Sequence, residues 1–102
     1  MKIDLSKNLI NIDRKPVENK TIGQILGEYI ASKKIENIGP VKAMNWALDL
    51  YENKPIDLDK SEFDNIRKAM ESTTELSCFV SGQIIECLLD NYEVHTSGKK
   101  DI

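Results

Sequence analysis

The spacing of apolar residues changes near residue 20. In the first twenty residues apolar and polar positions alternate in two short runs, and a turn-like segment at residues 13–16 follows the second run. This pattern predicts a small β-hairpin within residues 1–20, and an extended arm would show the same alternation. From Thr21 onward apolar residues recur every three or four positions, as on one face of a helix. The predicted fold is therefore mostly α: a compact four-helix bundle with a short N-terminal β-hairpin or extended arm packed against it.

The first two predicted helices have recognisable starts. Thr21 and Gln24 have the spacing of a capping box, which predicts a helix from residue 21 to about residue 34. Gly39 and Pro40 restart the chain, and proline is tolerated in a first helical turn. A second helix is therefore predicted from there to a point before Pro55.

The second predicted helix carries apolar residues on more than one side. Its expected inner face, widened by Ala47, consists of Val41, Met44, Leu48 and Tyr51. Trp46 and Leu50 lie to one side of this stripe. Either the helix is buried on two faces or Trp46 is an exposed anchor for a partner, and core burial is the favoured interpretation.

The third predicted helix follows a second capping box, formed by Asp59 and Glu62, and ends near residues 72–74. Its inner face is expected to hold Phe63, Ile66 and Met70.

The fourth segment, residues 76–89, is apolar around most of its circumference, which predicts the central helix of the fold. Gly82 within it would be explained by a close helix crossing. Residues 93–102 show no apolar period, so we expect a flexible tail there. The length of 102 residues fits one domain, which we place at residues 1–92 with the hairpin at residues 1–20.

The charge balance is mildly acidic, with 17 acidic and 14 basic side chains and a net charge of −3. This argues against direct nucleic-acid binding by neutralisation of many phosphates. Acidic side chains are concentrated in residues 56–95, which indicates either a solvated face or a surface for a basic partner. No apolar run approaches the roughly 20 residues of a membrane span, and the start lacks a signal-peptide pattern. We therefore expect a cytoplasmic protein without membrane contact.

The residue types that carry chemistry are sparse. The single histidine, His95, lies in the predicted tail, and Cys78 and Cys87 are nine residues apart on one predicted helix, too far for a disulfide. Residues 57–61 copy the ligand spacing at the start of a calcium-binding EF-hand loop. The loop then has Glu62 where glycine is needed and Lys68 where the bidentate glutamate is needed. We therefore expect no catalytic residues, no cofactor and no metal site, and a protein that is not an enzyme.

Five groups of short motifs follow one another between residues 3 and 90. They are Leu9-Ile10-Asn11-Ile12-Asp13 with Lys15-Pro16, Thr21-Ile22-Gly23, Trp46-Ala47 with Leu50-Tyr51, Ile56-Asp57-Leu58, and Gly82-Gln83-Ile84-Ile85-Glu86. In this order they resemble small proteins encoded in bacteriophage and prophage genomes. Arg14 stands where those proteins tend to have glycine, so the chain departs from the family at its first turn. The resemblance implies a phage origin and carries over no catalytic or binding residues.

These observations favour a non-enzymatic phage accessory protein in the cytoplasm of the bacterial host. We expect it to bind a protein partner, from the host or the phage, and to inhibit a host defence or nucleic-acid-handling factor through an acidic surface. The candidate contacts on that surface are Asp57, Asp59, Glu62, Asp64, Glu71 and Glu75.

The alternative is a virion or tail assembly helper that acts by self-association. In that hypothesis the subunit contact is apolar, and its candidate residues are Trp46, Leu50, Ile85 and Leu89. Homo-oligomer formation would distinguish the two hypotheses, because only the assembly role requires it.

Overall fold

The computed structural model describes the backbone of residues 1–100 and the side chains of residues 1–92. Within that part of the chain the helices are α1 (Ile22–Ser32), α2 (Pro40–Tyr51), α3 (Lys60–Ser72) and α4 (Cys78–Lys100). The strands are β1 (Lys2–Ile3), β2 (Asn8–Ile10), β3 (Pro16–Thr21) and β4 (Ile56–Asp57). The prediction of a mostly α fold with four helices is confirmed over these residues, with two small antiparallel sheets added.

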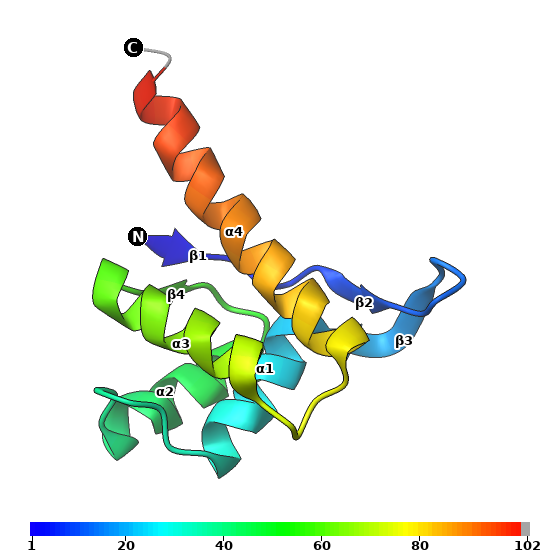
Figure 1. The fold of residues 1–102 in the computed structure, drawn as a ribbon, viewed down its shortest axis with the longest axis horizontal. Coiled ribbons are helices and arrows are strands. Elements are labelled where there is room, and N and C mark those ends of the chain that lie inside the picture. The colour runs from blue at the N-terminus through cyan, green and yellow to red at the C-terminus, as the bar shows by residue number, and fades with distance from the viewer. Residues whose placement is uncertain (101–102) are drawn as a thin grey trace.

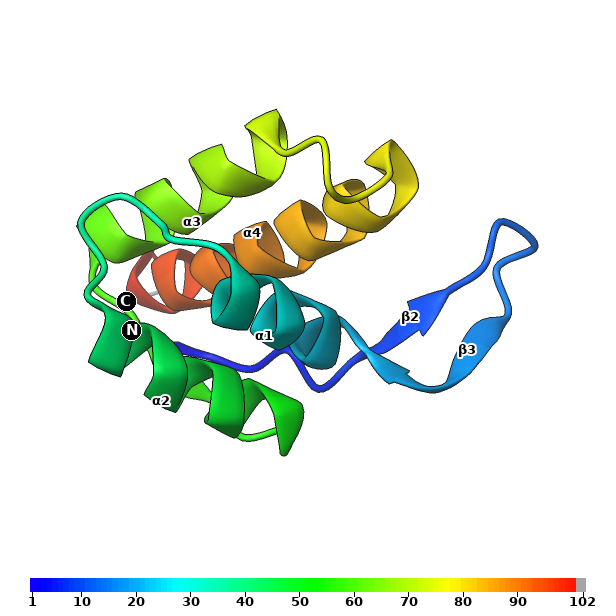
Figure 2. The ribbon, with the colours of Figure 1, turned by 90° about the horizontal axis from the view of Figure 1, so that it is seen from below.

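The helices pack in two pairs, which meet where α1 contacts α4. α1 packs against α2, α3 packs against α4, and α1 also contacts α4. Figure 2 shows α1 between α2 and α4, with the β2–β3 hairpin extending away from the helices. α4 likewise contacts two helices, α3 and α1, so α1 and α4 share the central position that was predicted for the fourth helix.

The N-terminal segment forms a hairpin, but with fewer residues than expected. β2 pairs with β3, whereas β1 pairs with β4, so that Lys2 lies opposite Asp57 and Ile3 opposite Ile56. Figure 1 shows β1 and β4 side by side below the upper part of α4. The alternation at Ile3 therefore belongs to a strand that pairs with a distant part of the chain.

The hairpin turn forms with arginine in place of glycine. The Arg14 N–H donates to the Asn11 carbonyl and the Asn11 N–H donates to the Lys15 carbonyl, both at 2.8 Å. This is the pattern of a three-residue loop, a turn followed by one residue in the left-handed region. That residue is Arg14, with φ of 69°. Glycine adopts this conformation without steric cost, so Arg14 holds a backbone conformation that favours glycine.

Local capping signals set the helix starts as predicted. The Thr21 side chain accepts from the Gln24 N–H and the Gln24 side chain accepts from the Thr21 N–H, which completes the capping box of α1. Asp59 and Glu62 form the same reciprocal pair at α3. α2 begins at Pro40.

One apolar core joins all parts of the described chain. Phe63, Ile66 and Met70 are buried on α3 as predicted. Trp46 and Leu50 of α2 are buried as well, at 6% and 1% exposure, so Trp46 is a core residue and not an exposed anchor. Close packing of α1 depends on Gly27, because an added Cβ there would lie 3.1 Å from the Ala47 carbonyl oxygen.

Two expectations for the fourth helix, its extent and the role of Gly82, are corrected. α4 runs to Lys100, well past residue 89. The backbone of residues 93–100, which were predicted to form a tail, is therefore helical. A Cβ on Gly82 would meet nothing within 4 Å, so no close helix crossing explains this glycine. Cys87 is buried but Cys78 is exposed. The side chain of His95 and residues 101–102 lie outside the described part.

Candidate functional site

The four residues predicted to form the inner face of the second helix lie on the outside of the molecule. Val41, Met44, Leu48 and Tyr51 are 69%, 54%, 58% and 59% exposed. We call this set the α2 face. The prediction that it packs into the core is wrong, and an apolar stripe more than two helical turns long faces outward instead.

The α2 face is exposed because α2 uses its opposite side for packing. With about 100° between successive helical residues, Trp46 and Leu50 point away from the α2 face. These two residues pack into the core, where α2 meets α1 and β4. An apolar stripe indicates a helix but does not identify which of two apolar sides is buried.

A groove adjoins the α2 face on the side of α1. It has a volume of about 470 Å³ and lies between the end of α1, the following loop and the first half of α2. Its lining is mainly apolar: Ile30, Ala31, Ser32, Lys33, Lys34, Ile35, Ile38, Pro40, Ala43, Met44, Ala47 and Leu48. Met44 and Leu48 belong to both features, so the α2 face and the groove form one continuous apolar surface.

Charged groups border this surface. Lys33 and Lys34 line the groove, and the Lys33 ammonium lies 3.2 Å from a Glu75 carboxylate oxygen. Lys42 pairs with Glu62 and lies over the Trp46 ring, 5.2 Å from its centroid. The hydrogen bond to the Glu62 carboxylate raises the pKa of Lys42, so this ammonium stays charged at neutral pH.

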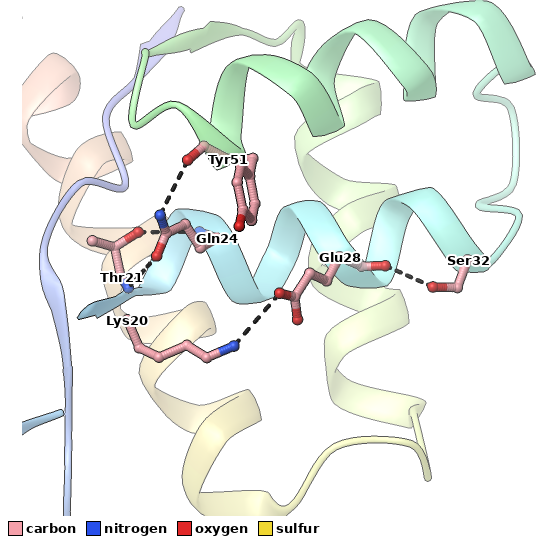
Figure 3. Close-up of polar contacts among 6 residues, drawn as sticks. All are labelled: Lys20, Thr21, Gln24, Glu28, Ser32 and Tyr51. Carbon is pink, nitrogen blue, oxygen red and sulfur yellow. Dashed lines mark hydrogen bonds and ion pairs between the residues drawn. The ribbon is translucent and has the colours of Figure 1, made fainter. Parts of the chain in front are cut away.

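The far end of the α2 face borders the start of α1. Figure 3 shows the Tyr51 side chain lying beside α1, next to Gln24. The Gln24 side-chain amide donates to the Tyr51 carbonyl at 3.1 Å. Glu28, one turn further along α1, accepts from the Lys20 ammonium at 3.5 Å. The border of the surface is therefore basic near the start of α2 and carries a carboxylate near its end.

The structure places the six acidic candidates in contacts within the chain. Asp59 caps α3, and Glu62 returns the capping bond and pairs with Lys42. The other four each lie within 4 Å of a cationic group: Asp57 by the Met1 ammonium, Asp64 by Lys60, Glu71 by Arg67 and Glu75 by Lys33. A basic partner would therefore compete with existing contacts.

The apolar contact proposed for self-association is also corrected. Trp46 and Leu50 are core residues and cannot reach another molecule without unfolding of α2. Ile85 and Leu89 on α4 are half-buried against the same core. The sequence did not predict that the α2 face is a surface. A signal for it was present, because α2 has two apolar sides and α1 can cover only one of them.

The remaining chemistry within the described residues is modest. No group of three or more histidine, cysteine or acidic side chains there could hold a metal ion. Burial raises the pKa of the Cys87 thiol, and hydrogen bonds from Ser6 lower the pKa of Asp4. None of the helices in the part of the chain described here is long and apolar enough to cross a membrane.

Comparison with known proteins found no match to a family model, a curated protein or a solved structure. The function is therefore inferred from the geometry of the surface itself.

Proposed function

We propose that this chain is a non-enzymatic accessory protein, built as a helical bundle, that acts by binding another protein through the α2 face and its groove. The observation that carries the proposal is the exposure of four large apolar side chains along one helix. Contiguous apolar patches of this kind mark interaction sites, because leaving them in water is unfavourable. Methionine and tyrosine are also enriched in protein interfaces.

The acidic surface has a secondary part in this proposal. The six carboxylates already have capping or ion-pair partners in the chain, so binding through them would exchange one ion pair for another. Such exposed pairs contribute little net free energy. Burial of the α2 face removes apolar surface from water, and this contributes more to the free energy of binding than the exchange of ion pairs.

The biological setting follows from the sequence resemblance. We propose a phage-encoded protein in the cytoplasm of a bacterial host, where binding inhibits a host defence or nucleic-acid-handling factor. The second candidate, an assembly helper that self-associates, is favoured by the regular spacing of apolar residues along the α2 face.

The proposal is tested by capture from a lysate of phage-infected bacteria with a tagged chain. Leu48→Glu places a charge in the middle of the α2 face, and we expect it to reduce retention of the partner at least about tenfold. The matched control is Ile12→Glu, the same kind of change at an apolar residue that is 88% exposed at the hairpin tip. It should leave retention unchanged.

A third variant separates the two surfaces. Asp64→Asn combined with Glu71→Gln neutralises exposed carboxylates of α3 without touching its cap. We expect this variant to retain the partner. Loss of the partner in this variant, with retention by Leu48→Glu, would return the function to the acidic surface and refute the α2 proposal.

A further inference from the structure

We propose that the protein seated on the α2 face is a second copy of this chain, with the two α2 helices antiparallel about a two-fold axis. The inference rests on the second candidate of the proposed function, self-association, because it uses the α2 face and names a second copy of the chain as its occupant. Three observations support it: the spacing of the apolar residues, the charges on one flank of α2, and the charges beside the groove.

The apolar residues are arranged symmetrically about the middle of α2. Val41 and Tyr51 are each five residues from Trp46, and Met44 and Leu48 are each two residues from it. In a two-fold contact, residue i meets residue j of the other copy and j meets i. An antiparallel pair centred at the level of Trp46 therefore matches Val41 with the second copy's Tyr51 and Met44 with the second copy's Leu48.

The same spacing is that of a coiled-coil seam. Steps of three, four and three residues between Val41 and Tyr51 place all four side chains in the a and d positions of a heptad. Ala47 and Asn45 flank the centre, and their modest size lets two helices approach closely. This spacing suits a second helix as the partner.

Charges on the outer flank of α2 fit an antiparallel pair. Lys42 lies near the start of α2, whereas Asp49 and Glu52 lie near its end on the same flank. The antiparallel arrangement brings Lys42 level with the second copy's Asp49 and Glu52. Lys42 is 53% exposed beside Glu62, and Glu52 is 58% exposed beside Lys54, so both have room for a second contact. A parallel pair would place like charges together.

Charges on the groove flank fit in the same way. Lys34 lines the groove beside the start of α2, and no described side chain pairs with it. Glu28 lies on α1 near the other end of the α2 face, where its only cationic neighbour within 4 Å in the described chain is Lys20. Two-fold symmetry brings Lys34 toward the second copy's Glu28, and the reverse contact follows automatically.

The proposed interface is small, and this limits the affinity of the dimer. Four large side chains and the edge of the groove make a contact at the lower end of specific interfaces, below about 1,200 Å² in total. We therefore expect a dimer that dissociates on dilution, with a dissociation constant on the order of micromolar. The dimer is expected to form at the concentrations that assembly or abundant expression would supply.

Sedimentation equilibrium from low micromolar to near-millimolar concentration tests the inference. The unaltered chain and Ile12→Glu should both show a monomer–dimer equilibrium with the same constant. Leu48→Glu should raise the dissociation constant at least about tenfold. Circular dichroism confirms that each variant is folded, which is expected because Leu48 and Ile12 are both exposed.

A charge exchange tests the antiparallel geometry. Lys34→Glu and Glu28→Lys should each weaken the homodimer severalfold, because each places two like pairs across the axis. An equimolar mixture of the two variants should recover the affinity of the unaltered chain, because both contacts in the mixed dimer then join opposite charges. Failure of the mixture to exceed either variant alone would overturn the antiparallel arrangement.

The outcomes separate this inference from the proposed function. A strict monomer at every concentration, or a dimer that Leu48→Glu leaves intact, overturns the second copy as occupant. If the lysate partner is still lost on Leu48→Glu in that case, the proposed function stands with a different protein on the α2 face. If Leu48→Glu changes neither dimerisation nor capture, both proposals fail.

Discussion

Two helical glycines of this chain, Gly27 and Gly82, occupy opposite surroundings. Gly27 faces α2, where an added Cβ would lie 3.1 Å from the Ala47 carbonyl oxygen and 3.2 Å from the Leu50 Cβ. Both contacts are tighter than ordinary van der Waals contact, and one involves backbone that cannot rotate away. Gly82 in α4 has open space at the same position. The absence of a side chain is thus required at Gly27 and has no packing reason at Gly82.

The same substitution should therefore have opposite effects at the two sites. Gly82→Ala is expected to raise the free energy of unfolding by about 0.5–1 kcal/mol, because alanine is the better helix former. Gly27→Ala is expected to lower it by about 1–3 kcal/mol, because α1 and α2 must move apart. Urea denaturation of both variants, with unchanged slopes, measures the two effects. Stabilisation by Gly27→Ala would show that the α1–α2 contact is looser than described.

Residues with a positive φ angle show which backbone features can be predicted from the sequence. Asn53 has φ of 61° just after α2, where its N–H donates to the Leu50 carbonyl, and asparagine is common at this helix-end position. Arg14 has φ of 69° at the hairpin turn. Arginine carries no preference for that conformation, so only hydrogen bonds formed by the complete hairpin identify it.

At the scale of elements, α4 holds the N-terminal segment through two side-chain amides. Gln83 accepts from the Ile10 N–H at 2.9 Å and donates to the Ile10 carbonyl at 3.1 Å. Asn91 makes the same pair of bonds with the backbone of Asp4, at 3.0 Å and 3.1 Å. Each amide replaces a strand neighbour that the short sheets do not supply. The segments before and within β2 are thereby fixed to the last helix.

Removal of one of these amides should loosen the hairpin. Gln83→Glu keeps the size and the acceptor but replaces the donor with an oxygen that faces the Ile10 carbonyl. We expect a loss of about 1–2 kcal/mol in the free energy of unfolding. Faster amide exchange at Ile10 should accompany it. The control is Glu86→Gln, an exposed change on the same helix, which should alter neither quantity. Unchanged exchange in Gln83→Glu would mean that β3 alone holds β2 in place.

The predictability of each element depended on whether its signals were local. The capping pairs Thr21 with Gln24 and Asp59 with Glu62 are three residues apart, so the helix starts could be read from the sequence. The pairing of β1 with β4 joins residues more than fifty positions apart and left no local signal. For the candidate site, the spacing in the sequence groups the residues of the α2 face into one stripe. Which side of α2 packs into the core depends on its contact with α1, and the spacing does not show this.

For the whole molecule, the two cysteines report on the integrity of the core. Cys78 is exposed at the start of α4, whereas Cys87 is 6% exposed among residues drawn from the strands and helices. Access to the Cys87 thiol therefore requires α4 to separate from the core. Because one cluster of buried residues joins the described elements, this opening is expected to approach global unfolding in free energy.

Thiol labelling and pH should both follow this difference. At pH 8 Cys78 should react rapidly with a thiol reagent, and Cys87 should react only on the time scale of opening.

Desolvation by burial raises the pKa of Cys87. The nearby carboxylates of Asp90 and Asp4 also raise this pKa, whereas Lys7 lowers it. Below the pKa of the unfolded thiol, about 8.5, the thiol is protonated in both states, so its titration does not change the free energy of unfolding. Above it the unfolded state loses the proton more readily, so the free energy of unfolding falls as pH rises toward the folded pKa.

The comparison that isolates this effect uses a Cys78→Ser background with and without Cys87→Ala. The alanine variant should be less stable at pH 7 because it leaves a small cavity, and the difference from its parent should narrow as pH rises above about 8.5. Urea denaturation at several pH values measures this difference. A constant difference across that range would show that Cys87 keeps an ordinary pKa, and hence that water reaches the centre of α4. Rapid labelling of both thiols would lead to the same conclusion and would place α4 outside the cooperative core.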